Sequence, residues 1–126
     1  MSAAAHAQSS YAHPARPLKT PRDIEYDLMA GITGRLTAAL PPTRGRLNPS
    51  LVAALHDNSR MWAAFATDLA NPGNAFPSDL RANLFALAEF TLKHSAKVLR
   101  DEATADVLIE INTAVMRGLR GSRGRP

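Results

Sequence analysis

Residues 48–69 read NPSLVAALHDNSRMWAAFATDL, and this stretch decides the fold. Asn48 and Pro49 form a helix-start signal, since Asn is a good N-cap and proline fits the first helical position. At about 100° per residue, one face of the following helix collects a single apolar stripe. Its members are Leu51, Leu55, Asn58, Trp62, Phe65, Ala66 and Leu69. Asn71-Pro72-Gly73-Asn74 consists of turn-forming residues, so the stretch predicts one amphipathic helix that packs in a bundle.

Three more segments show the same helical period. Before this stretch, a helix is expected after Thr20-Pro21, with a ridge of Ile24, Leu28, Ile32, Leu36 and Leu40 that ends at Pro41. After it, a helix opens at Pro77-Ser78-Asp79 with a wide stripe. We expect this stripe to comprise Leu80, Leu84, Leu87, Thr91 and Val98, widened by Phe85, Ala88, Leu92 and Leu99. The last helix is expected to be capped by Thr104, with Val107, Leu108, Ile111, Val115 and Leu119 on one face. Four such helices with short connections predict an all-α fold, a four-helix up-and-down bundle.

The two ends of the chain differ in composition from the middle. Residues 1–19 are rich in Ala, Ser, His and Pro, and they predict a flexible arm. Residues 20–120 are the expected helical domain. Residues 121–126 are expected to form a disordered basic tail, and the four arginines after Met116 account for the whole net charge of +4. A charge excess confined to one end does not indicate a folded basic surface, so we do not expect nucleic acid as the partner.

No reactive constellation is visible in the sequence. The chain has no cysteine, and neither His56 nor His94 has a second His or a carboxylate three or four residues further along a helix. Phosphate-binding glycine loops and nucleophile elbows are missing as well. We therefore expect neither catalysis nor a metal or cofactor. The chain lacks a signal peptide and an apolar run of membrane-spanning length, so we expect a cytoplasmic protein that acts by binding another protein.

Polar residues within the apolar stripes are the first candidates for a binding site. Asn58 lies in the middle of one stripe, Asn83 on the edge of the next, and Asn112 beside Leu108. A buried amide without partners costs about 1–3 kcal/mol, so each must find hydrogen bonds. Bonds between helices would set the register of the bundle, whereas bonds to a partner backbone would mark a docking groove.

Five more residues complete the candidate set. Trp62 is either a large core residue or an anchor for a partner, and core is the safer interpretation. Arg60 and Arg81 suit a partner carboxylate or helix end. Ile109 and Met116 lie almost opposite part of the last stripe. A bundle that packs on one face of this helix would leave them exposed.

The sequence also resembles a known family. Asn58-Ser-Arg-Met-Trp-Ala-Ala-Phe65 resembles the Asn-x-(Arg/Lys)-x-Trp-x-x-Phe core of FlaF, a flagellar biosynthesis regulator of alphaproteobacteria. Further similar segments are Phe76-Pro77-x-x-Leu80-Arg81-x-Asn83-Leu84, Leu108-Ile-Glu-Ile-Asn112 with Gly118-Leu-Arg-Gly121, and Tyr11 with Pro21-Arg-Asp-Ile-Glu25. They occur in order over residues 11–121. Phe76 and Thr113 depart from the family pattern, which has Leu and Arg there, and the loop from Pro41 to Pro49 is longer than usual.

The resemblance implies a factor without enzymatic activity or cofactor that is required for flagellin production and secretion. Flagellin is then the expected partner, bound as by an export chaperone through the last two helices, and a FlbT-like regulator is a further one. Two alternatives stay open at this stage. One is post-transcriptional regulation of flagellin mRNA together with FlbT, and the other is a self-associating structural protein. The expected oligomeric state is a monomer or weak dimer.

Overall fold

The computed structural model describes residues 21–40 and 47–124, with the side chains of residues 25–40 and 47–119. Over these ranges it contains four α-helices and no strand, which confirms the predicted all-α class. They are α2 (Pro21–Ala39), α3 (Pro49–Ala70), α4 (Ser78–Leu99) and α5 (Asp106–Gly124). The predicted arm lies outside the described residues. In the described part of the chain, none of the helices has the length and apolar character that crossing a membrane requires.

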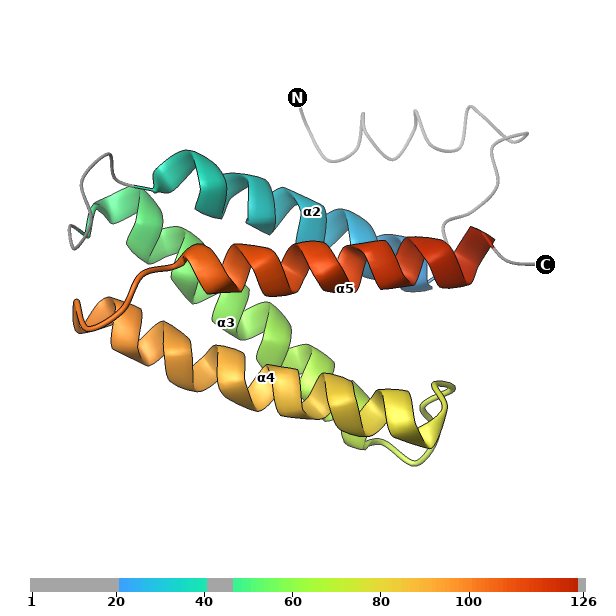
Figure 1. Cartoon of the computed structure of the whole chain (residues 1–126). Coiled ribbons are helices and arrows are strands. Elements are labelled where there is room, and N and C mark those ends of the chain that lie inside the picture. The colour runs from blue at the N-terminus through green and yellow to red at the C-terminus, as the bar shows by residue number, and fades with distance from the viewer. Residues whose placement is uncertain (1–20, 41–46, 125–126) are drawn as a thin grey trace, which may run out of the picture.

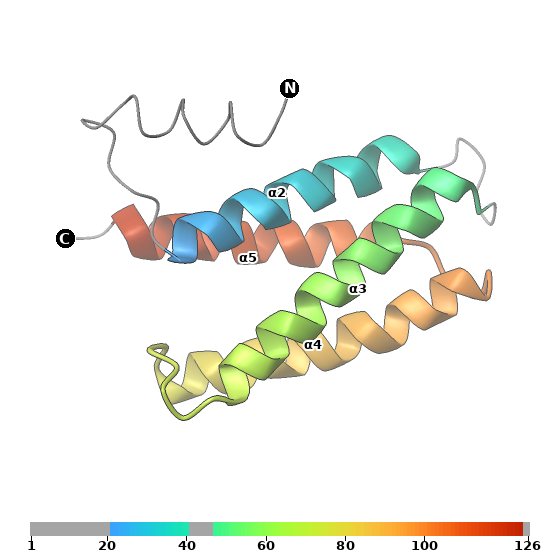
Figure 2. The same cartoon turned by 180° about the vertical axis from the view of Figure 1, so that it is seen from behind.

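The helices pack in the order α2, α3, α4, α5 around the bundle, so that α3 and α5 lie on a diagonal. Figures 1 and 2 show α2 and α5 side by side, with the start of α2 near the end of α5. Helix α3 packs on both α2 and α4. Helices α4 and α5 approach each other near their connection and diverge toward the other end (Figure 1). Helix α4 is therefore held mainly by α3.

The core consists of two clusters stacked along the bundle. The first surrounds Leu36, Leu55 and Leu108, near the α4–α5 connection. The second surrounds Trp62 and Ala88, and the rings of Trp62 and Phe65 lie 5.5 Å apart in a tilted arrangement. Large apolar side chains without polar atoms fill most of this space, so hydrophobic burial supplies the main driving force for folding.

The predicted helix start at Asn48 is confirmed in detail. The Asn48 side chain accepts a hydrogen bond from the backbone N–H of Leu51 at 2.8 Å, and Pro49 is the first helical residue. Asn48 Nδ2 also donates to the Ala39 carbonyl at 3.0 Å. One side chain thus caps α3 and satisfies a carbonyl at the end of α2, which links the two helix ends.

The connection from α4 to α5 begins with a left-handed residue. Asp101 has φ of 60°, and the N–H of Glu102 donates to the Lys97 carbonyl at 2.8 Å. This is the bonding pattern of a Schellman C-cap, in which glycine is the usual left-handed residue. The expectation that Thr104 caps the last helix is wrong. Ala105 holds that position, since its carbonyl accepts the first backbone bonds from Leu108 and Ile109.

Helix α5 differs from its sequence prediction at its end and on its faces. It continues through Gly124, four residues past the expected domain boundary at 120. Its buried residues are Leu108, Asn112, Val115 and Leu119, whereas Val107 and Ile111 are only partly buried. The centre of the buried face is therefore rotated away from Val107 and Ile111 toward Asn112.

Candidate partner-binding site

A polar centre between the two core clusters joins three helices. Asn112 Nδ2 donates to Thr33 Oγ1 at 3.0 Å and to Asn58 Oδ1 at 2.9 Å, while its Oδ1 accepts from Trp62 Nε1 at 2.9 Å. Thr33 in turn donates to the Met29 carbonyl at 2.6 Å. All of the amide's hydrogens are used, and its oxygen has a donor. The centre ties α2, α3 and α5 together and leaves out α4.

Trp62, Asn58 and Asn112 are each fully buried. Trp62 is thus a core residue, and two of the three stripe asparagines bond between helices, as one of the two sequence interpretations proposed. A buried amide that bonds other helices sets their register, because any slip leaves polar atoms without partners. The Nδ2 of Asn58 and the hydroxyl of Thr91 make no hydrogen bond to other described residues.

Arg81 caps the carboxyl end of a neighbouring helix. Its Nε and Nη2 donate to the Leu69 carbonyl at 3.2 and 3.1 Å, and Nη2 also reaches the Asn71 carbonyl at 3.4 Å. The last carbonyls of a helix lack backbone partners and carry partial negative charge. Arg81 therefore stabilises the α3–α4 turn within this molecule. Its presence in the sequence does not require the partner carboxylate or partner helix end that the sequence analysis considered.

The remaining polar candidates lie on the surface. Asn83 is exposed on α4, which corrects the expectation that it must be satisfied inside the bundle or by a partner. Water can serve an exposed amide. Arg60 is exposed on α3, one turn from Asp57. The role of both residues in partner binding stays a prediction.

Ile109 and Met116 are partly buried. Ile109 packs against the first core cluster, and Met116 packs against the second. The expectation that the bundle leaves them exposed is wrong, because both flanks of the buried face of α5 contact the core clusters. Their part in partner binding stays a prediction, and the larger apolar surface lies elsewhere.

That surface lies along α3 and α4. Phe85, Leu92 and Leu99, expected to widen the buried stripe of α4, are 36–44% exposed. They are seven residues apart and so form one row along the helix. Phe85 lines a hollow together with Leu69 and Ala70 of α3, which places the row on the α3 side of α4. We call this row, together with Leu47 before α3 and Val52 in its first turn, the α3–α4 outer face.

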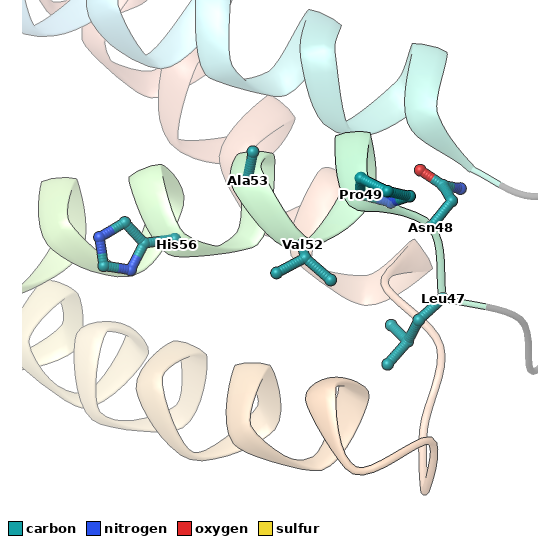
Figure 3. A pocket seen from close by; sticks show the side chains of 6 residues that line it. All are labelled: Leu47, Asn48, Pro49, Val52, Ala53 and His56. Atoms are coloured by element: carbon teal, nitrogen blue, oxygen red, sulfur yellow. The ribbon is translucent and has the colours of Figure 1, made fainter.

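Figure 3 shows the second hollow of this face, at the start of α3. Leu47, just before α3, and Val52 of α3 point into the space beside α4, with His56 one turn further along the helix. Leu47 and Val52 are 37% and 40% exposed. One hollow lies where α3 ends and α4 begins, and the other lies at the start of α3.

The histidines of the described region show no arrangement for chemistry. His94 Nε2 lies 2.7 Å from the Thr104 carbonyl, and its ring stacks on Phe90 at 5.4 Å. This contact joins α4 to the start of α5, where the two helices are closest. Within residues 21–40 and 47–124, no three His, Cys, Asp or Glu side chains gather as a metal site would require.

Sequence reasoning missed Thr33 and the α3–α4 outer face. Thr33 lies next to Ile32 in sequence, and nothing in the stripe pattern marks its hydroxyl as part of a network. The heptad spacing of Phe85, Leu92 and Leu99 was visible. An apolar heptad row fits a buried stripe and an exposed docking row equally well, however, and only the position of α3 distinguishes them.

Comparison with known proteins gives a family. A family model described as flagellar protein FlaF matches residues 7–119. The chain belongs to the FlaF family. The match takes in all four helices up to Leu119 and includes the Asn58–Phe65 segment, the Arg81 cap and Asn112. No curated protein and no solved structure matches this FlaF-family chain.

Some of the residues that carry the FlaF resemblance have structural roles in this bundle. Asn58 and Trp62 of the Asn-x-(Arg/Lys)-x-Trp-x-x-Phe segment, together with Asn112 of the closing segment, meet at the polar centre. Arg81, from the segment around Phe76, caps α3. Several of the residues that carry the resemblance therefore hold this bundle together. As a FlaF-family member the chain is a flagellar protein.

Proposed function

We propose that this FlaF-family chain supports flagellin production and secretion by binding flagellin directly, as an export chaperone. Two arguments support a binding role. The chain is a flagellar protein by family, and the FlaF resemblance implies an action on flagellin. Flagellin monomers carry long terminal helices that are unpaired before assembly, and a helical protein with spare apolar surface can cover one of them.

The observation that carries the proposal is the α3–α4 outer face. A row of large apolar side chains that remain at least one-third exposed along a helix pair is informative when its members are contiguous. Most polar residues of the family-like segments make their hydrogen bonds within the bundle. The α3–α4 outer face is therefore the surface that is available to a partner. We also propose that the protein acts by binding rather than by catalysis, and that it acts in the cytoplasm.

Calorimetry with purified flagellin monomer is the direct test. We expect a one-to-one complex with a negative heat-capacity change, because apolar surface is buried on binding. A control titration uses flagellin that has been assembled into filaments, in which the terminal helices are already paired and no binding is expected. If no complex forms at tens of micromolar, a limit of about −6 kcal/mol, the chaperone proposal fails.

A pull-down from motile cells separates the alternatives. Recovery of flagellin as the dominant protein supports direct binding. Recovery of flagellin mRNA or of a FlbT-like regulator, without flagellin protein, supports post-transcriptional control instead. Recovery of a second copy of the chain alone supports the self-associating structural protein.

A further inference from the structure

We infer that α4 opens and closes as a separate unit on a core made by α2, α3 and α5. The inference goes beyond the proposed function and does not depend on which partner the chain binds. Three observations support it: the contacts that tie α4 to other elements, the size of the side chains that α4 buries, and the hydrogen bonds of the hydroxyls on its buried face.

The first observation is the way in which α4 is tied to the rest of the bundle. The polar centre joins α2, α3 and α5 through three side-chain hydrogen bonds of 2.9–3.0 Å, and α4 takes no part in it. Near the start of α4, Arg81 donates to the Leu69 carbonyl at 3.1 Å. Toward its end, His94 Nε2 lies 2.7 Å from the Thr104 carbonyl. Between Arg81 and His94, no α4 side chain is hydrogen bonded to another described helix, so packing alone holds the middle of α4.

The second observation is the small size of the side chains that α4 buries. Between Leu84 and Val98, the buried residues of this helix are Ala88, Thr91 and Ser95. The larger side chains of the α4 row on the α3–α4 outer face are 36–44% exposed. Small side chains remove little apolar area from water, and hydrophobic stabilisation scales with that area. Closing of α4 on the core is therefore weakly driven along most of its length.

The third observation concerns the two hydroxyls in the middle of this buried face. Ser95 Oγ donates to the Thr91 carbonyl of its own helix at 2.7 Å. The Thr91 side chain has no exposed surface, and its hydroxyl makes no hydrogen bond to another described residue. A buried hydroxyl without a partner destabilises the closed state, whereas water can hydrate it once the helix opens. Neither hydroxyl links α4 to a neighbour, and Thr91 favours opening.

Opening of α4 changes the apolar surface that the protein presents. Leu84 and Ala88 of α4 belong to the second core cluster together with Trp62 and Phe65 of α3. When α4 opens, apolar side chains of this cluster are uncovered, while the hydrogen bonds of Asn112 keep the other three helices together. The bundle can thus hide or present part of its core by moving one helix.

A pair of cysteine variants tests the opening, because the chain has no cysteine of its own. Ala88 of α4 and Ala54 of α3 are both fully buried alanines. Ala54 packs in the first core cluster with Ile32 and Leu36 of α2. In the full chain, Ala88→Cys is expected to react with a small thiol reagent at least about tenfold faster than Ala54→Cys, since a buried thiol reacts only when its surroundings open. Circular dichroism melts establish that both variants fold, and equal rates in folded variants overturn the inference.

Hydrogen exchange of the unsubstituted chain is an independent measurement. After correction for intrinsic rates, amides in the middle of α4 are expected to exchange at least about tenfold faster than those in the middle of α3. Asn112→Ala weakens the polar centre, so it is expected to speed exchange in α3 and α5 and to change the α4 rates less than about twofold. Equal protection of α3 and α4 in the unsubstituted chain overturns the inference. So does an Asn112→Ala variant in which α4 speeds up as much as α3.

Thr91→Val tests the physical cause. It removes the buried hydroxyl and keeps a branched side chain, so exchange in α4 is expected to slow about tenfold. Thr67→Val is the matched control, since Thr67 is exposed on α3 and its hydroxyl bonds the Ala63 carbonyl at 3.1 Å. The control is expected to change α4 exchange less than about twofold. A folded Thr91→Val variant in which α4 exchanges as fast as in the wild type contradicts the inference.

Discussion

Trp62 Nε1 donates a hydrogen bond of 2.9 Å to Asn112 Oδ1, from α3 to α5 across the diagonal of the bundle. The indole can only donate, so it determines which end of the Asn112 amide is the oxygen. The amide nitrogen must then face Thr33 and Asn58, where it finds two acceptors. One tryptophan thus fixes the orientation of a buried amide that joins three helices.

Replacing Asn112 is expected to cost much more stability than replacing an exposed asparagine. Asn112→Ala leaves the Trp62 donor unsatisfied and removes the donor from two acceptors, so we expect a loss of about 2–4 kcal/mol in the free energy of unfolding. Urea denaturation followed by circular dichroism measures this loss. Asn83→Ala is the control and is expected to cost less than about 0.5 kcal/mol. Equal stabilities of the two variants would contradict the assigned network.

Two Trp62 variants separate packing from hydrogen bonding. Trp62→Ala removes a fully buried ring and is expected to cost about 3–5 kcal/mol. Trp62→Phe keeps an aromatic ring but leaves the Asn112 oxygen without its donor, so we expect about 1–3 kcal/mol. Equilibrium denaturation measures both losses of stability. A Trp62→Ala variant that unfolds like the wild type and yet fails to bind flagellin would instead assign Trp62 to the interface.

Arg81 is expected to stabilise the α3–α4 turn locally. Arg81→Ala removes the donors to the Leu69 and Asn71 carbonyls, and we expect a loss of about 1 kcal/mol, since the group is only partly buried. Hydrogen exchange should speed up in the last turn of α3, with little change near Asn48. Arg81→Lys should recover only part of the loss, because an ammonium lacks the fork of donors. Unchanged exchange in this turn would rule out the capping role.

Asp101 is a place where stability can be gained. Its left-handed φ of 60° disfavours a residue with a Cβ, and glycine adopts it without strain. Asp101→Gly is therefore expected to raise the free energy of unfolding by about 0.5–1 kcal/mol. Asp101→Ala serves as the control. It keeps the strain and should not stabilise. Thermal melting compares the three proteins, and a glycine variant that melts below the wild type would refute the assignment.

The ion pair between α2 and α3 predicts an acid-side titration. Arg35 Nη1 lies 2.6 Å from Asp57 Oδ2, and this hydrogen bond lowers the pKa of Asp57 below its ordinary 3.8. Because the folded pKa is depressed, the stabilisation is present above the unfolded pKa and is lost as pH falls through the folded value. NMR titration of the Asp57 carboxyl should show a midpoint below 3.8 in the wild type.

Arg35→Gln provides the comparison for this titration. The midpoint of Asp57 should rise toward its ordinary value, because the main cause of its depression is gone. The effect on stability is expected to be small, since both partners are largely exposed and screened by solvent. A midpoint that does not move would show that Arg35 and Asp57 are not paired in solution.

The helices and their ends were largely predictable, because they depend on local chemistry. Asn48-Pro49 specified the start of α3 through side-chain capping, and the apolar period of the Leu51–Leu69 stripe specified its buried face. Thr104 shows where local chemistry misleads: a good capping residue was available, yet Ala105, whose side chain is buried in the core, holds the position.

The sequence by itself determined four amphipathic helices and placed Asn58, Trp62 and Asn112 in apolar stripes. It could not show that these residues meet, since Asn58 and Asn112 are separated by 54 positions and join only when α3 and α5 face each other diagonally. It could not show which flank of α4 is covered either. Periodicity locates a stripe on one helix, but exposure depends on the helices around it. The tertiary structure alone therefore decided that Trp62 belongs to the core and that Leu92 and Leu99 face outward.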